Sequence, residues 1–251
     1  MPFDGNVKPR PEPSGLLNRI ILIVDRSEVG AREIQDRALV DVSFWLQHAR
    51  KNGRAHAVGL VCLKMSFQPI ENYGVIGNMR SIALVGIDGS IDFLCYPNFD
   101  SPTVFAALLD GEKGGRFHLE PQLTNMRVRQ LYLPDTNILL TRFLAEEGVA
   151  ELTDYMPIGS IREQPNEIIR TVSVIRGNVH FTMRCEPRFD YARSAHRTEV
   201  SDQCAMFFPA NNSCPPMALY STVALGPHDQ DVISDFSLQS GHLATRHDGG
   251  L

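Results

Sequence analysis

An eight-residue run with alternating apolar and polar side chains limits the possible folds of this chain more than any other pattern in it. The run extends from Val179 to Glu186, and its apolar members are Val179, Phe181, Met183 and Cys185. Successive side chains of a β-strand point to opposite faces, so the run predicts a strand with one face in a core and one in water.

Short strand-like segments surround this run. Residues 168–175 are rich in β-branched side chains, and Arg176-Gly177-Asn178 joins them to the alternating run. A three-residue connector with a central glycine suits positive φ, so the two segments are predicted to form a hairpin. Residues 220–225 and 233–238 add two late strands whose pairing the sequence does not fix.

Two further hairpins are predicted upstream. Residues 138–145 and 149–155 flank Glu146-Glu147-Gly148. The other hairpin is centred on Asp88-Gly89, between strand-like residues 82–85 and 91–95, and Asp-Gly is among the strongest short hairpin signals.

One short helix is expected within this β-rich pattern. Ser101 is a suitable N-cap, Pro102 suits the first helical position, and Gly111 is placed to end the helix. Val104, Phe105, Leu108 and Leu109 form its apolar stripe. Many short strands and one minor helix predict a mainly β fold, an antiparallel β-sandwich.

The chain divides near Met65 into two parts. Residues 1–64 form an N-terminal extension whose fold the pattern does not fix, with one strand-like segment at residues 20–24 and helix-favouring composition at residues 31–51. Residues 65–251 carry the regular β pattern and are expected to form the sandwich domain.

Charge and hydropathy exclude several kinds of partner. The 251 residues carry a formal net charge of −5 without a run of Lys or Arg, so no nucleic-acid or anionic membrane surface is indicated. The apolar stretch at residues 20–24 is too short for a signal-peptide core, and none is long enough to span a membrane. A cytoplasmic location is therefore expected.

Metal and cofactor sites are not indicated either. No two of the five cysteines have the two-residue spacing of a zinc or redox motif, which favours reduced, buried thiols. His228, Asp229 and Asp231 lie in a loop flanked by Gly and Pro without a second cluster of ligands, so a solvated loop is favoured over a metal site.

The carboxylates of the β region do not suggest a catalytic acid and base. Asp88 fits turn chemistry, and Glu146 and Glu147 lie at a predicted turn tip. Asp92 lies between two apolar strand residues and is expected to be solvated or hydrogen-bonded on the opposite face. No catalytic residue is assigned.

Several motifs, taken in order, carry a family resemblance. The segment from Tyr73 to Pro102 reads YGVIGNMRSIALVGIDGSIDFLCYPNFDSP. It is followed by GGRFHLEP, YLPDTNILLTRF, LTDYMP and EPRFDYARSAH. Over residues 66–246 the chain resembles the N-terminal domain of glycoside hydrolase family 15, the bacterial-type glucoamylases and their trehalase-like relatives.

This resemblance implies a β-sandwich that packs against a following (α/α) barrel. In the family, inverting hydrolysis of α-glucosidic bonds takes place in the barrel, between two glutamates of its helical part. The barrel is absent from this sequence, so the chain is expected to be a truncated, inactive fragment. Its expected partners are a barrel, in cis or in trans, and an α-glucoside sugar.

The same resemblance points to residues at the rim of the sugar site or at the barrel interface. One group follows the IGN and FDSP motifs and comprises Asn78, Arg80, Asn98, Phe99 and Asp100. Arg188, Asp190 and Tyr191 form the second group, in which Arg188 and Asp190 are candidates to pair with the barrel or with each other. For Asp100, capping of the predicted helix is the competing explanation.

Two alternatives remain open. A free-standing carbohydrate-binding or scaffold module would need exposed aromatic platforms, for which Tyr73, Tyr96 and Tyr191 are candidates. A hydrolase completed in trans would need a barrel-sized partner and an exposed apolar patch on this chain.

Overall fold

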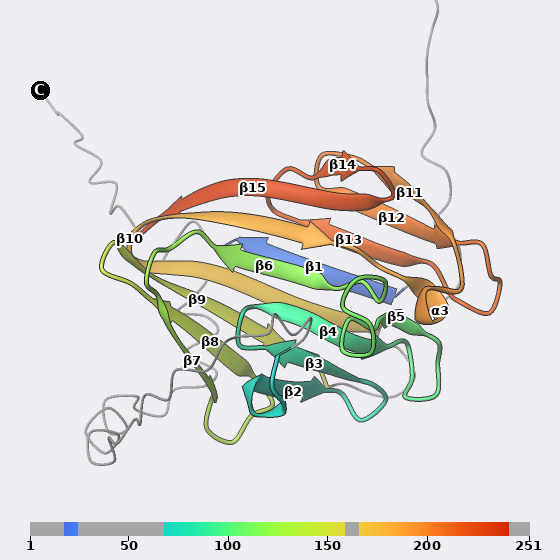
Figure 1. The fold of residues 1–251 in the computed structure, drawn as a ribbon, viewed down its shortest axis with the longest axis horizontal. Coiled ribbons are helices and arrows are strands. Elements are labelled where there is room, and N and C mark those ends of the chain that lie inside the picture. The colour runs from blue at the N-terminus through green and yellow to red at the C-terminus, as the bar shows by residue number, and fades with distance from the viewer. Residues whose placement is uncertain (1–17, 25–67, 159–165, 241–251) are drawn as a thin grey trace, which may run out of the picture.

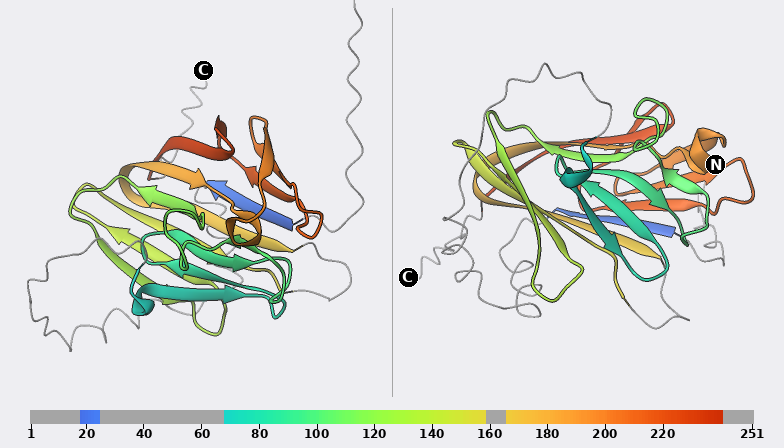
Figure 2. Two further views of the ribbon diagram at one scale, coloured as in Figure 1. Left: turned by 45° about the vertical axis from the view of Figure 1, so that its right-hand side comes forward. Right: turned by 60° about the horizontal axis from the view of Figure 1, so that its bottom comes forward.

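The computed structural model describes residues 18–24, 68–158 and 166–240, which form two β-sheets packed face to face (Figures 1 and 2). One sheet has the strand order β7-β8-β9-β10-β1-β13-β12-β11, and the other has the order β2-β3-β4-β6-β10-β15-β14, with β5 paired to β4. We call them the first and the second sheet. The predicted β-sandwich is confirmed.

The elements are listed here in chain order. They are β1 (Asn18–Val24), the 3-10 turn η2 (Ile70–Asn72), β2 (Tyr73–Gly77), β3 (Ile82–Gly86), β4 (Ser90–Cys95), β5 (Thr103–Phe105), β6 (Phe117–Pro121), β7 (Arg127–Tyr132), β8 (Leu139–Leu144), β9 (Gly148–Tyr155), β10 (Glu167–Cys185), α3 (Phe189–Ala192), β11 (His196–Val200), β12 (Cys204–Pro209), β13 (Met217–Ser221), β14 (Gly226–His228) and β15 (Asp231–Gln239).

The core lies between the sheets and is built by period-two alternation. In β9 every second residue is buried, and the alternating run of β10 places Val179, Phe181, Met183 and Cys185 inside. Fully burying one large apolar side chain stabilises a fold by about 1.5–3 kcal/mol. Alternation therefore fixes which face of each strand turns inward.

The longest strand corrects one predicted hairpin. Residues 167–185 form a single strand, β10, and Arg176-Gly177-Asn178 lies within it rather than turning the chain back. Gly177 does have positive φ, 86°, but it lies beside a bulge in the β9 pairing. Beyond the bulge β10 enters the second sheet and pairs with β6 and β15, so it joins the two layers (Figure 1).

The predicted helix after Ser101 is also wrong. Thr103, Val104 and Phe105 form β5, which pairs with β4. All three residues are buried, whereas a helix would need its apolar side chains on one face. The short helix of the described chain is instead α3, in which Asp190 and Tyr191 have left-handed φ of 55° and 56°.

The other two hairpins form as predicted. β3 and β4 flank Asp88-Gly89, and β8 and β9 flank the Glu146-Glu147 turn. The strand predicted at residues 220–225 is β13, which ends earlier, at Ser221, and the other late strand is β15.

The strand predicted at residues 20–24 forms as β1. It lies between β10 and β13 and, unlike the antiparallel pairs around it, runs parallel to both. The helix-favouring residues 31–51 lie outside the described residues. No helix in the described part of the chain is long and apolar enough to cross a membrane.

Candidate functional site

The predicted site residues gather at one end of the sandwich. Asn78 and Arg80 lie in the β2–β3 turn, and Asn98 lies in the loop between β4 and β5. Arg188 and Tyr191 lie on the segment around α3, which packs beside β5 (Figure 1). We call this end of the molecule the rim and define it by the residues Asn78–Arg80, Asn98–Asp100 and Arg188–Tyr191.

The β2–β3 turn is ordered by its own asparagine. The Asn78 side-chain oxygen accepts hydrogen bonds from the backbone N–H groups of Arg80 (3.1 Å) and Ser81 (3.0 Å). This side chain therefore acts as a turn former. The intervening Met79 has a φ of 67° and an exposed fraction of 85%.

The β4–β5 loop is attached to that turn. The Phe99 N–H donates to the Arg80 carbonyl at 2.8 Å, and the Arg80 guanidinium donates to the Asn98 side-chain oxygen at 3.4 Å. Phe99 remains 55% exposed. Asp100 is exposed and caps no helix, because the predicted helix does not form.

The second group is attached to the loop through β5. The Arg188 N–H donates to the Val104 carbonyl at 2.8 Å, and the Tyr191 N–H donates to the Thr103 hydroxyl at 2.8 Å. Burial raises the pKa of the nearby Cys95 thiol, although a hydrogen bond with Tyr191 lowers it in part. The structure thus brings both predicted groups to one surface.

Both charged rim residues of this segment form ion pairs within the chain. Arg188 makes a bidentate pair with Asp231, at 2.5 and 2.8 Å, and Asp190 pairs with Arg193 at 2.6 Å. Arg188 and Asp190 therefore do not pair with each other. The hydrogen bond to Asp231 raises the pKa of Arg188, although burial opposes this shift.

Asp231 also overturns the predicted solvated loop. The residue is only 8% exposed and is paired with the Arg188 guanidinium, while His228 and Asp229 are exposed as predicted. In the described part of the chain, no group of three His, Cys, Asp or Glu side chains is arranged to hold a metal ion.

The carboxylates of the β3–β4 hairpin have structural partners. Burial alone would raise the pKa of Asp88, but hydrogen bonds from Ser90 and Gln68 and the nearby His118 hold it below its usual value. Asp92 is fully buried rather than solvated, and it accepts a 2.7 Å hydrogen bond from the Tyr73 hydroxyl. Asp88 therefore does the turn chemistry predicted for it.

The three candidate sugar platforms differ in exposure. Tyr96 is 1% exposed, and the Tyr73 hydroxyl donates its hydrogen bond to the buried Asp92 carboxylate. Tyr191 is 45% exposed, and the Arg193 guanidinium lies 5.6 Å from its ring centroid. Tyr191 and Phe99 are thus the exposed rings of the rim, and Phe99 is an additional platform candidate that the structure reveals.

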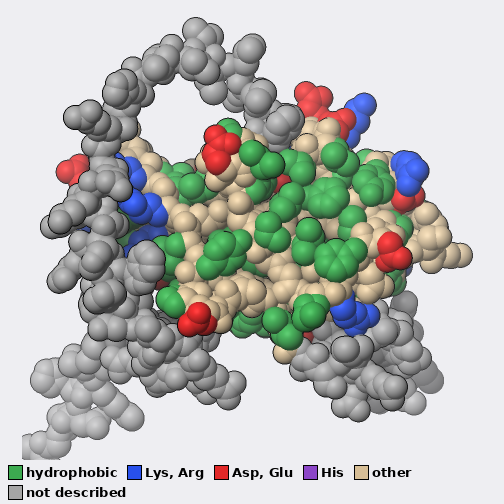
Figure 3. All heavy atoms as spheres, turned by 90° about the horizontal axis from the view of Figure 1, so that it is seen from below, with side chains coloured by type: hydrophobic (Ala, Val, Ile, Leu, Met, Phe, Trp, Pro, Cys, Tyr) green, Lys and Arg blue, Asp and Glu red, His purple; other side chains and the backbone are tan. Residues whose placement is uncertain are grey.

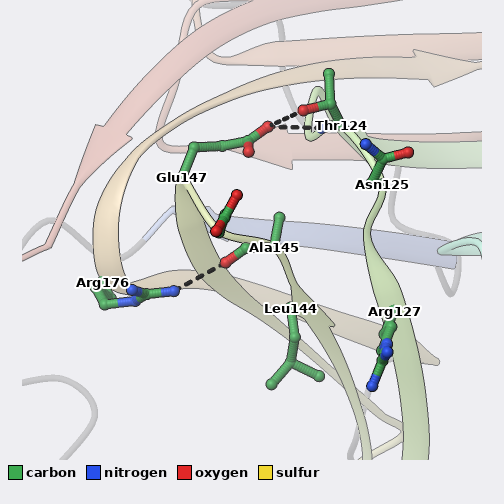
Figure 4. Close-up of a pocket in the computed structure, with 8 residues that line it drawn as sticks. Thr124, Asn125, Arg127, Leu144, Ala145, Glu147 and Arg176 are labelled. Atoms are coloured by element: carbon green, nitrogen blue, oxygen red, sulfur yellow. Dashed lines mark hydrogen bonds between the residues drawn. The ribbon is translucent and has the colours of Figure 1, made fainter.

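A concavity of about 420 Å³ lies at the other end of the sandwich, where β10 bends (Figure 4). The Glu147 carboxylate there accepts hydrogen bonds from the Thr124 N–H (2.6 Å) and hydroxyl (2.7 Å), which lower its pKa. Arg176 donates to the Ala145 carbonyl at 2.8 Å. Glu147 is an ionised structural group here, as its predicted turn position suggested.

The chain matches a family model described as "Trehalase-like, N-terminal" over residues 63–230. It is 32% identical over 155 residues to a trehalase of Mycolicibacterium smegmatis, covering 55% of this chain and 23% of that protein. A trehalase of Thermoplasma volcanium is 36% identical over 132 residues, which is 51% of this chain and 21% of the relative.

Trehalase 1 of Sulfolobus acidocaldarius is 41% identical over 118 residues, which cover 47% of this chain and 19% of that protein. The matched segments thus span less than a quarter of each of these relatives. Comparison with solved structures found no match. Because the family model covers 168 of the 251 residues, the chain belongs to the trehalase-like N-terminal domain family.

Proposed function

We propose that this chain is the non-catalytic N-terminal domain of a family 15 glycoside hydrolase that cleaves α-glucosidic bonds such as that of trehalose. Its role is to pack against a catalytic (α/α) barrel, in cis or in trans, and to shape one rim of the sugar site. The observation that carries the proposal is the match to trehalases that extend far beyond the matched segment.

The rim has the composition of a protein interface. Phe99 and Tyr191 are large, half-exposed rings, and Met79 in the β2–β3 turn is also exposed. Aromatic residues and Met are enriched at interface centres. Backbone hydrogen bonds hold the rim loops in place, so little ordering is needed on docking.

The buried carboxylates support a structural rather than a catalytic role. Asp154 and Asp231 are paired with arginines, and Asp92 accepts a hydrogen bond from Tyr73. An inverting glycosidase needs one carboxyl group free to donate a proton and another free to activate water. These three carboxylates are engaged with partners inside the domain.

Glucose release is the direct test. The purified 251-residue chain is incubated with trehalose and with maltose, alone and together with a family 15 barrel that lacks its own sandwich. We expect no glucose from the chain alone and restored hydrolysis when the barrel is present. Robust hydrolysis by the chain alone would overturn the proposal.

A matched pair of variants tests the rim. Phe99→Ser removes a ring that is 55% exposed at the rim, whereas Ile175→Ser removes a side chain that is 58% exposed near the bend of β10. We expect Phe99→Ser to weaken barrel binding at least about tenfold, as for a central interface aromatic residue. Equal binding by both variants would place the interface elsewhere.

A further inference from the structure

The exposed edges of the two sheets carry different protections against pairing with another chain. β7 carries Arg127 and Arg129, and β11 carries Arg197 and Glu199, all of them exposed. β14 is only three residues long and contains Pro227. Charges, proline and shortness are the usual devices that keep edge strands from aggregating.

The edge strand β2 has none of these devices. Its sequence, Tyr-Gly-Val-Ile-Gly, has no charged residue and no proline, and the strand pairs on one side only, with β3. The Val75 N–H points away from β3, since it bonds to a side chain of another element. Such an edge is a ready template for strand addition.

Two side chains of the β7–β8 hairpin occupy that edge instead. The Tyr132 hydroxyl accepts a hydrogen bond from the Val75 N–H (2.7 Å) and donates one to the Val75 carbonyl (2.9 Å). The Asn137 side-chain amide donates to the Gly77 carbonyl at 2.6 Å. These three bonds use the groups that an added strand would need.

The surface around this edge is apolar. Figure 3 shows the side of the molecule that carries β2 and the β7–β8 turn, with many hydrophobic and few charged side chains. Exposed fractions are 43% for Val75 and 65% for Ile158, which lies beside Tyr132 and Asn137. An uncharged edge beside apolar surface favours pairing with an equally uncharged strand, and β2 of a second copy meets that requirement.

We propose that Tyr132 and Asn137 form a cap that closes β2 to strand addition, and that the uncapped edge pairs with β2 of a second copy of this chain. Antiparallel pairing about Val75 would satisfy the same N–H and carbonyl groups in both copies. The cap keeps the domain monomeric at this edge, independently of any barrel bound at the rim.

Light scattering on the full chain tests the proposal. The Tyr132→Ala/Asn137→Ala variant is expected to show at least twice the mass of the original chain at tens of micromolar. Adding Val75→Lys, whose charge would lie at the edge, is expected to restore the monomer. The matched control, Leu131→Ala, removes a neighbouring side chain with the same 45% exposed fraction as Tyr132 and should stay monomeric.

A second measurement does not depend on association. Tyr132→Phe keeps the ring and removes only the hydroxyl, so hydrogen exchange of the Val75 amide is expected to become about tenfold faster while β4 amides are unchanged. The proposal is overturned if this exchange rate is unaltered. It is also overturned if the double variant stays monomeric, or if Val75→Lys leaves its increased mass unchanged.

Discussion

Arg170 is the largest fully buried side chain of the described structure, and it joins the two sheets. From β10 it makes a bidentate pair with Asp154 of β9, at 2.7 and 3.1 Å. Two further N–H groups donate to the carbonyls of Phe117 in β6 (3.1 Å) and of Gly89 in the β3–β4 turn (2.8 Å), on the side of the second sheet. A charge held by four hydrogen bonds can lie in a core that excludes water.

Removing this arginine is predicted to destabilise the fold strongly. Arg170→Met leaves the buried Asp154 carboxylate without a counter-ion, so the free energy of unfolding should fall by about 3–5 kcal/mol. Urea denaturation followed by circular dichroism measures the change. The control is Arg142→Met, which breaks the partly exposed pair with Glu151 on the same sheet and should lose about 0–1 kcal/mol. Equal losses would contradict this account of Arg170.

His196 is predicted to make the free energy of unfolding depend on pH. Burial lowers the pKa of His196 from the ordinary value of 6.5. A 2.9 Å hydrogen bond to the Gln230 carbonyl acts in the opposite direction but does not cancel the shift. The unfolded chain therefore binds a proton more readily than the folded chain. Consequently the free energy of unfolding should decrease as the pH falls through about 6.5.

Denaturation midpoints at pH 7.5 and pH 5.5 measure this effect. His196→Gln should reduce the difference between the two midpoints, and His180→Gln, at an exposed position of β10, is the control substitution. A pH dependence that is unchanged by His196→Gln would assign the effect to other groups.

The sequence did not predict which side chains of the site pair with one another. The rim positions were selected from the family motifs, and the structure does place them together. The pairing of Arg188 with Asp231 spans 43 positions, and no local pattern links an arginine after one strand to an aspartate at the start of another. Only the folded register brings the two side chains into contact.

At the scale of elements, the strand-like segments read from the sequence match eight of the fifteen strands of the described structure, because alternation and turn signals act within a few residues. The sequence assigned no strand-like segment to the other strands, β2, β5, β6, β7, β11, β12 and β14. The wrong hairpin and the wrong helix both rest on glycine and proline signals whose meaning depends on distant contacts. Gly177 marks a bulge because its backbone lies against Glu147, and Pro102 precedes β5 because β4 offers that segment a pairing partner.

Gly177 provides a test of how β10 passes between the sheets. A Cβ atom at this residue would lie 2.3 Å from the Glu147 carbonyl oxygen, and its φ of 86° disfavours any other residue. Gly177→Ala should therefore lower the free energy of unfolding by more than about 1 kcal/mol. The control is Gly226→Ala, where the nearest atoms would lie 3.7 Å away and the change should stay within about 0.5 kcal/mol. Equal effects would show that the bulge tolerates a side chain.

For the whole molecule, the first sheet depends on a strand from the N-terminal extension. β1 lies between β10 and β13 and pairs with both, so it connects these two strands within one sheet. The change of pattern near Met65 did not indicate that β1 belongs to this sheet. Alternation identifies a single strand but not the strands with which it pairs. Ile20 and Leu22 of β1 are fully buried.

Loss of β1 is therefore predicted to be severe. Burial of Ile20 and Leu22 contributes about 3–6 kcal/mol together, from about 1.5–3 kcal/mol each. That is a large share of the 5–15 kcal/mol by which domains are typically stable. A chain that starts at Asp25 should consequently unfold at a much lower temperature, or aggregate through the exposed edges of β10 and β13.

The matched control is a chain that starts at Asn18, which retains all of β1 and should melt close to the original chain. Differential scanning calorimetry on the two truncated chains separates the contribution of β1 from that of the residues before it. Rescue of the shorter chain by a peptide with the sequence NRIILIV would show that β1 acts by filling its place in the sheet. If both truncated chains melt alike, the sandwich does not need β1, and a domain that begins near Met65 becomes the better description.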